Sequence, residues 1–290
     1  MKKEHVTFTA ADGFELKGLW LEAEENTQGT AVLHSATSVK KEYYLKFASF
    51  LAEQGYDILI YDYRGIGEAQ RGSLKDLQAT MHEYGTLDQN AALAYLIHER
   101  GRTGITWLGH SVGSQLMGVV NNMEHVRQVL AINCSTGYWG YFPFPWNLMS
   151  LYMWHLAGPL LTTVKGYFPA SMLGMGEPLP KGVFYEWRRW CNSRTHFRKW
   201  LRKTRGIERF QGFKVPITAI YTSDDYIAGK KTVAALLDFY PDAEHKVIEV
   251  EAKQLGGKVG HLGIFRSKFQ ETGWPIILRE MKAGQKAPVA

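Results

Sequence analysis

The stretch Ile105-Thr106-Trp107-Leu108-Gly109-His110-Ser111-Val112-Gly113 decides the fold of this 290-residue chain. It begins as an apolar strand, ends in the pattern Gly-x-Ser-x-Gly, and is followed by helical spacing over residues 111–121. A strand, a sharp turn and a helix in this order are typical of a nucleophile elbow, in which the serine hydroxyl stands clear of the sheet. We therefore expect Ser111 to be a nucleophile. The Val112 N–H, at the start of the helix, is expected to donate to an oxyanion.

Strands and helices alternate on both sides of the elbow. Apolar and period-2 patterns predict further strands at residues 5–9, 14–21, 30–33, 57–61, 128–133, 215–221 and 246–251. Helical spacing predicts helices at residues 43–54, 84–99, 230–239 and 274–281. This alternation predicts an α/β fold with a mostly parallel central sheet and helices on both of its faces.

The alternation stops at Gly137, where an aromatic-rich region begins. Residues 138–200 hold sixteen aromatic side chains, punctuated by prolines. We expect residues 137–210 to form a helical cap on a core made by residues 1–136 and 211–290. The cap aromatics would form either a surface for an acyl chain or a core packed on itself. The most apolar stretch, residues 148–164, is shorter than the roughly 20 residues of a spanning helix, and we expect it to be buried or to lie under the cap.

A serine nucleophile needs a neighbouring base, and the base needs an acid that holds its tautomer. After such an elbow the acid comes next along the chain and the histidine last. The loop after residues 217–221 offers Asp224 and Asp225 as acids. The glycine-rich loop 256–263 offers His261 as the base. His245 precedes the final strand, so it would lie at the wrong end of that strand.

Four segments of the chain carry a resemblance to a known family. They are Asp62-Tyr-Arg-Gly-Ile-Gly67, the elbow Gly109-His-Ser-Val-Gly113, Ser223-Asp-Asp-Tyr-Ile227 and Gly260-His-Leu-Gly-Ile-Phe-Arg266. With them the chain resembles the serine aminopeptidase and monoacylglycerol-lipase-like group of α/β-hydrolases, and the cap resembles that of a bacterial branch of predicted hydrolases. The resemblance implies an α/β-hydrolase fold and a Ser-Asp-His triad. It favours Asp225, because the acid in related sequences is the later of such a pair.

The loop after residues 30–33 is the expected place of a second oxyanion donor. By position this donor is the Ala36 N–H, or the Thr37 N–H if the loop is shifted by one residue. We expect His34 to orient this loop and His110 to pack beneath the elbow. Candidates for contact with the substrate are His34, Thr37, His110, Tyr138 and Trp139.

The net charge of +6 is concentrated in residues 188–209, which hold nine basic residues and one acidic residue. This segment is either a solvated helix face or a surface that attracts anionic substrates or lipid headgroups. No nucleic-acid-binding motif accompanies the charge, so nucleic acid is not an expected partner.

Cys134 and Cys191 have neither disulfide-framework nor metal-ligand spacing. No signal peptide is recognised, and we expect a cytoplasmic protein without a transmembrane segment, with peripheral membrane contact left open.

Three functions are compared. The first is hydrolysis of a carboxylic ester or thioester, without metal or cofactor. Its expected substrate is a small hydrophobic acyl compound, with an anionic group left open. The second is an aminopeptidase, which would need cap carboxylates to hold an ammonium group, and the only acids between Gly137 and Ile207 are Glu177 and Glu186. The third is a non-catalytic binding protein. Dehalogenases and epoxide hydrolases of this fold need an aspartate at the elbow, so Ser111 excludes their mechanism.

Overall fold

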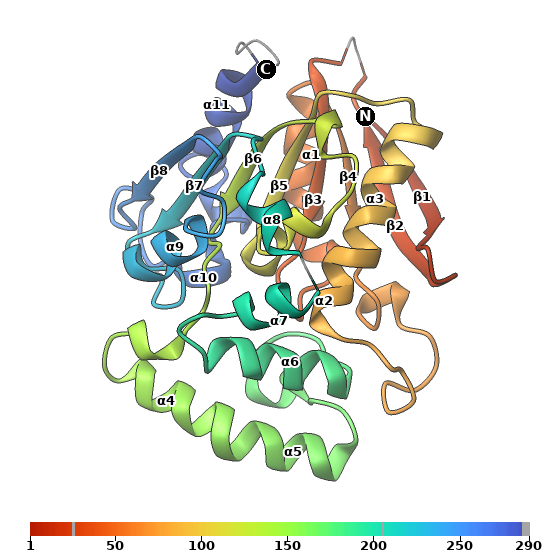
Figure 1. Cartoon of the computed structure of the whole chain (residues 1–290). Helices are drawn as coiled ribbons and strands as arrows, with labels where there is room; N and C mark the ends of the chain where they lie inside the picture. The colour runs from red at the N-terminus through yellow and green to blue at the C-terminus, as the bar shows by residue number, and fades with distance from the viewer. Residues whose placement is uncertain (25–26, 205, 286–290) are drawn as a thin grey trace.

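The computed structural model describes residues 1–24, 27–204 and 206–285. Its centre is an eight-stranded sheet with the strand order β1-β2-β4-β3-β5-β6-β7-β8 (Figure 1). The strands β3 to β8 run parallel to one another, whereas β2 is antiparallel to both of its neighbours, β1 and β4. The strand bounds are β1 Lys2–Thr9, β2 Glu15–Glu22, β3 Gly29–His34, β4 Tyr56–Tyr61, β5 Ile105–His110, β6 Val126–Ile132, β7 Ile217–Thr222 and β8 His245–Val250. The predicted α/β fold and mostly parallel sheet are confirmed.

Helices cover both faces of this sheet, because alternate residues of each inner strand point to opposite faces. Along β5, Trp107 belongs to one hydrophobic cluster and Leu108 to the other. The cluster around Trp107 includes residues of α3 and α9, and the cluster around Leu108 includes residues of α1 and α11. The bounds of these helices are α1 Leu45–Glu53, α3 Asn90–Ala94, α9 Lys230–Leu237 and α11 Trp274–Gln285. Figure 1 shows α3 and α9 on the near face and α1 and α11 on the far face.

The segment between β6 and β7 is mostly helical and lies below the sheet in Figure 1. Its first two helices, α4 (Trp146–Tyr152) and α5 (Gly158–Lys165), are joined without a break by a π-helical segment, Met153–Ala157. Three further helices follow: α6 Lys181–Cys191, α7 Arg198–Lys203 and α8 Ile207–Gln211. In the core, α2 (Met81–Glu83) precedes α3, and α10 (Gly260–Gly263) follows β8.

The expected burial of residues 148–164 is wrong. This stretch forms most of α4 and α5, and many of its large apolar side chains face solvent. The reason is that the helix packs on the rest of the segment through the opposite face, where Trp154, Gly158 and Thr162 are buried. Hydropathy alone could not show which face is covered.

The α-helix expected over residues 111–121 does not form. Two short 3-10 turns, Ser111–Ser114 and Met117–Val119, take its place. Carbonyls that would accept α-helical bonds accept side-chain donors instead. The Gly113 carbonyl accepts from Trp107 Nε1 at 3.0 Å, and the Gln115 carbonyl accepts from Tyr240 Oη at 2.8 Å. A long helix dipole behind Ser111 is therefore not part of this site.

Candidate active site

The turn after β5 holds Ser111 in a strained conformation. Its φ is +54°, in the left-handed region that side chains with a Cβ rarely adopt. The glycines on either side allow this turn, because there is no room for a larger residue. A Cβ on Gly109 would lie 1.8 Å from Ser114 Oγ, and one on Gly113 would lie 2.3 Å from the His34 carbonyl oxygen. The Gly-x-Ser-x-Gly pattern is thus required by packing as well as by the turn.

Three residues from separate loops meet at this turn. His261 Nε2 lies 2.9 Å from Ser111 Oγ, and His261 Nδ1 lies 2.7 Å from Asp225 Oδ2. Asp225 Oδ1 accepts the N–H groups of Ile227 at 2.8 Å and Ala228 at 3.0 Å. Burial by itself would raise the pKa of Asp225. The neighbouring His261 and the two backbone donors outweigh that effect, so the pKa of Asp225 is lowered and its carboxylate is ionised.

Asp224, the other candidate acid, points to a different partner. Its two carboxylate oxygens accept the N–H groups of Val259 at 2.8 Å and Gly260 at 3.0 Å. Asp224 therefore holds the backbone just before His261, whereas Asp225 holds the imidazole ring. His245 begins β8 at the amino end of that strand and bonds to neither.

Two buried side chains hold the His261 backbone in place. The His261 carbonyl accepts hydrogen bonds from His110 Nε2 at 2.9 Å and from Asn133 Nδ2 at 2.8 Å. Asn133 has a φ of +47° and follows directly after β6. Sequence reasoning missed it. The only available signal was that asparagine tolerates left-handed backbone better than most residues, which is not specific enough to identify a site.

A hydrogen-bonded relay connects this histidine loop to the loop after β3. The Ala36 N–H donates to Tyr44 Oη at 2.9 Å, and the Tyr44 hydroxyl donates to His110 Nδ1 at 2.7 Å. The proton order is consistent because His110 donates from Nε2, and burial lowers the pKa of His110 to about 3, which keeps it neutral. Tyr44, which the sequence did not single out, is therefore a central buried partner of both loops.

This relay contradicts the expectation that Ala36 supplies an oxyanion donor, because Tyr44 already accepts its N–H. The N–H of Thr37, the alternative donor, is not engaged in this way. Within the residues that the structure describes, its N–H makes no hydrogen bond, and its side chain is half-buried at the surface of the loop.

Contact of His34 and His110 with a substrate is also contradicted, because both side chains are completely buried. His34 stacks on Trp107 with ring centroids 3.6 Å apart, and its Nδ1 lies 2.7 Å from Tyr61 Oη. Burial holds the pKa of His34 well below its usual value, so this ring is neutral. His34 supports the loop from beneath, which agrees with its expected orienting role.

The aromatic candidates Tyr138 and Trp139 lie where the chain leaves the core. Both are half-buried, and Trp139 Nε1 donates to Asn192 Oδ1 at 2.9 Å within the cap segment. Nearby, Trp146 stacks on Tyr226 with ring centroids 4.3 Å apart. A hollow of about 390 Å³ lies between this part of the chain and the Asp225 loop. The Trp146–Tyr226 contact holds the start of α4 beside Asp225.

Among the residues that the structure describes, one group of carboxylates has the spacing of a metal site. Glu42, Asp62 and Glu68 converge, but the ammonium of Lys41 lies among them at 2.7–2.9 Å from each. Lys41 is buried. Its burial would lower the pKa of its ammonium, and the three carboxylates outweigh that effect and raise it. A lysine cation therefore fills the position that a metal would need.

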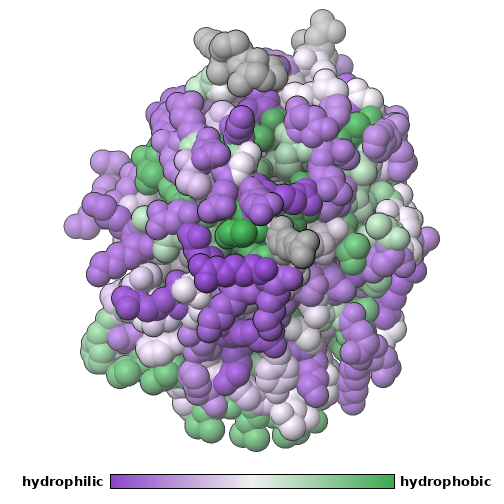
Figure 2. Space-filling view, in the orientation of Figure 1, coloured by the Kyte–Doolittle hydropathy of each residue, from purple (hydrophilic) through white to green (hydrophobic). Residues whose placement is uncertain are grey.

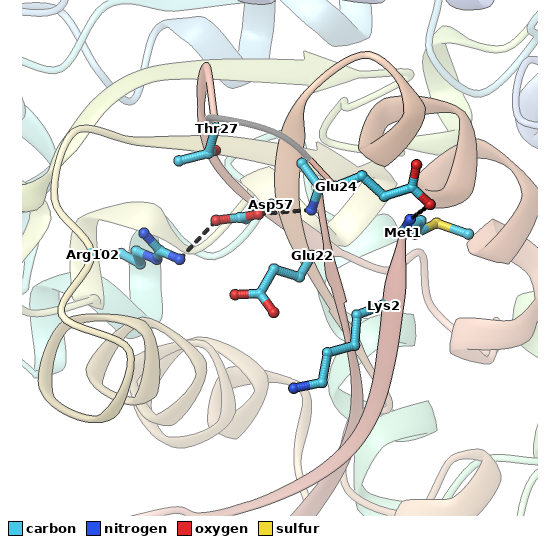
Figure 3. Close-up of a pocket in the computed structure, with 8 residues that line it drawn as sticks. Met1, Lys2, Glu22, Glu24, Thr27, Asp57 and Arg102 are labelled. Atoms are coloured by element: carbon cyan, nitrogen blue, oxygen red, sulfur yellow. Dashed lines mark hydrogen bonds and ion pairs between the residues drawn. The ribbon is translucent and has the colours of Figure 1, made fainter.

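A second hollow, of about 650 Å³, is lined by polar side chains that include Glu22, Asp57 and Arg102 (Figure 3). Asp57 at the amino end of β4 forms part of its wall and bonds to Arg102 at 2.8 Å. The Met1 amino group pairs with Glu24 at its rim. Ser111 follows the carboxyl end of the parallel strand β5, so this polar hollow lies at the opposite edge of the sheet from Ser111, His261 and Asp225.

Comparison with known proteins agrees with this architecture. The family model of the alpha/beta hydrolase fold matches residues 32–120. The solved structure of DcsB with a substrate analogue is 16% identical, with a TM-score of 0.63 and all of both chains covered. The Pyrococcus furiosus esterase Pf2001 is 17% identical, with a TM-score of 0.60, 97% of this chain and 92% of that chain covered. A thermophilic esterase from Thermogutta terrifontis is 13% identical, with a TM-score of 0.58, 99% of this chain and 100% of that chain covered.

No curated protein matches the chain in sequence. The low identities of the solved structures establish the fold alone. Together with the sheet order and the elbow, they show that the chain has the α/β-hydrolase fold.

Proposed function

We propose that this protein is a serine hydrolase that cleaves a carboxylic ester or thioester through an acyl-enzyme. The observation that carries the proposal is the hydrogen-bonded chain from Ser111 Oγ through His261 to Asp225. Esterases among the structures of the same fold support the same reaction class. The resemblance to the serine aminopeptidase and monoacylglycerol-lipase-like group is consistent with it.

The reaction runs in two halves. Ser111 Oγ attacks the acyl carbonyl carbon while His261 Nε2 takes the serine proton, and the imidazolium then gives that proton to the departing alcohol or thiol. In the second half His261 takes a proton from water, the hydroxide attacks the acyl-enzyme, and Ser111 leaves with the proton restored. Asp225 holds the tautomer of His261 and stabilises the imidazolium between these steps.

Two backbone N–H groups stabilise the oxyanion in this mechanism. Val112 directly follows the nucleophile, and we assign the second donor to Thr37, because the Ala36 N–H is bonded to Tyr44. Each donor of this kind is typically worth about 10²–10³ in turnover. The relay through Tyr44 and His110 would keep this loop and the His261 loop at a fixed separation.

An aminopeptidase is disfavoured by the state of the cap carboxylates. Glu186 is buried and accepts from the backbone N–H and the ring of His82 at 2.8 and 2.9 Å. Glu177 Oε1 lies 3.3 Å from Lys40 Nζ. Both acids between Gly137 and Ile207 are therefore engaged, which leaves neither of them free to hold the ammonium group of a peptide.

The proposal is tested with a fluorophosphonate probe and p-nitrophenyl acyl esters. We expect the wild type and Ser193→Ala, a control at a cap-surface serine, to be labelled, and Ser111→Ala to be unlabelled. We expect His261→Ala to lose at least about 10³ in turnover, whereas His245→Ala keeps wild-type turnover. Equal labelling of Ser111→Ala would refute the proposal. Cleavage of proline p-nitroanilide without ester cleavage would replace it with the aminopeptidase.

A further inference from the structure

The outer face of α4 and α5 carries a continuous apolar stripe. From residue 148 to residue 164 its large side chains recur at helical spacing and are more than half exposed: Leu148 (54%), Met149 (56%), Tyr152 (60%), Leu156 (57%), Leu160 (60%) and Val164 (73%). Phe144, just before α4, is 77% exposed. Monomeric soluble proteins rarely expose apolar patches of this extent unless the patch binds something. We call these seven residues the apolar stripe.

The apolar stripe is not the face that holds the helix in the fold. The opposite face packs on α6, where Trp154 contacts Trp187 edge-on at 4.8 Å between ring centroids. At Gly158 an added Cβ would lie 2.5 Å from the Phe184 ring, so the two helices are in close contact there. A helix that is already anchored through one face has no structural need for apolar residues on the other face.

The surface around the stripe is positively charged. Residues 138–204 contain nine basic side chains and two acidic ones. The acids are Glu177 and Glu186, which are paired with Lys40 and His82, as described above. The exposed basic residues are Lys165, Lys181, Arg189, Arg194, Lys199, Arg202 and Lys203. Arg205, also part of the basic segment, lies outside the described residues.

Figure 2 shows where hydrophobic and hydrophilic residues lie on this side of the molecule. Hydrophobic residues lie along the lower edge of the molecule, where Figure 1 places α4 and α5. A hydrophilic area lies directly above them, over α6 and α7. An apolar helix face next to a basic surface is the arrangement of helices that lie in the plane of a membrane interface, with apolar side chains among the acyl chains and cations near anionic headgroups.

We propose that the apolar stripe docks this protein on an anionic lipid surface. Self-association through the same face would bring two basic segments together and would be opposed by their charge, whereas anionic lipids complement it. Within the described residues, no helix is long and apolar enough to cross a bilayer, so the contact lies on the surface of the membrane. In Figure 1, α6 and α7 lie between the sheet and α4–α5, so the docked face would be on the side of the cap segment away from the sheet.

Vesicle flotation of the full chain tests this inference. We expect wild-type protein to float with phosphatidylcholine vesicles that contain phosphatidylglycerol, and to bind pure phosphatidylcholine at least about tenfold more weakly. The double variant Leu156→Glu/Leu160→Glu should lose at least about tenfold in binding to anionic vesicles. Val247→Glu is the matched control, since Val247 is 53% exposed on β8 and lies outside the stripe.

Three outcomes would overturn the inference. These are an absence of wild-type binding, equal binding of the double variant, and equal binding to neutral vesicles. A concentration-dependent dimer that the double variant abolishes, without vesicle binding, would show that a second copy covers the face instead. Ser111→Ala should bind vesicles like the wild type, so failure of the lipid inference and failure of the proposed hydrolase function can be told apart. Unchanged circular dichroism and melting of the double variant would confirm that it is folded.

Discussion

Replacing Asp225 by asparagine gives the most direct test of how the proposed triad works. Oδ1 of residue 225 accepts two backbone N–H groups, from Ile227 and Ala228, so the amide oxygen of Asp225→Asn should stay in that position. The amide N–H group would then face His261 Nδ1. The imidazole must present a lone pair there and carry its proton on Nε2, toward Ser111, where it cannot accept the serine proton.

The magnitude follows from the alternative orientation of the amide. Turning it over restores the correct tautomer of His261 but places an NH₂ group against two N–H donors. Leaving two buried donors without acceptors costs about 2–4 kcal/mol. That cost leaves roughly one molecule in 30 to 900 competent, because each 1.4 kcal/mol is about tenfold. The lost charge stabilisation of the imidazolium adds to it, so we expect kcat/KM to fall by about 10³–10⁴.

Asp224→Asn is the matched comparison. It should lose one of the two hydrogen bonds to the Val259–Gly260 backbone and about 1–2 kcal/mol of unfolding free energy. The tautomer of His261 would be unchanged, and kcat/KM should stay within about tenfold of the wild type. The assay is p-nitrophenyl butyrate hydrolysis at neutral pH, with urea unfolding of each variant. If Asp225→Asn stayed within tenfold of the wild type while Asp224→Asn lost 10³, the assignment of the acid would be reversed.

Two further predictions concern buried partners outside the triad. Tyr44→Phe leaves the Ala36 N–H and His110 Nδ1 without partners, so urea unfolding should show a loss of about 2–4 kcal/mol; a loss below 0.5 kcal/mol would contradict the relay. His82 has its pKa raised because its hydrogen bond and charge interaction with Glu186 outweigh the lowering by burial. A raised pKa stabilises the fold fully below the unfolded value near pH 6.5, and the contribution disappears as the pH rises through the folded value. His82→Gln should therefore lower the urea midpoint more at pH 5.5 than at pH 8.5, and an equal effect at both would refute the ion pair.

Much of the fold could be read from local patterns. A parallel strand buried on both faces must be mostly apolar, as Ile105–Leu108 is apart from Thr106, and a tight turn after such a strand needs glycines around the serine. The order of elements along the chain also placed Ser111, Asp225 and His261 at the carboxyl ends of their strands. Strand patterning, turn residues and the order of elements depend only on short segments of the chain, so they can be predicted from the sequence.

Contacts between distant segments were decided only by the tertiary structure. The Tyr44 hydroxyl accepts a hydrogen bond from the Ala36 N–H, so the proposed oxyanion donor is Thr37. No local sequence pattern shows which of two adjacent N–H groups a buried side chain will bind. The carbonyls of Gly113 and Gln115 accept hydrogen bonds from side chains elsewhere in the chain, and 3-10 turns form where an α-helix was expected. These contacts are not visible in the local sequence either.

The apolar stretch 148–164 shows the same limit. Its sequence specifies a hydrophobic helix and nothing about which side is covered, because apolar residues occur all round it. Packing on α6 through Trp154 and Gly158 left the other side in solvent. The sequence by itself determined a helix-covered parallel sheet with a serine at its elbow. The tertiary structure decided which groups hold that serine's partners in place and which surface of the molecule is left uncovered, because both depend on contacts between residues far apart in the chain.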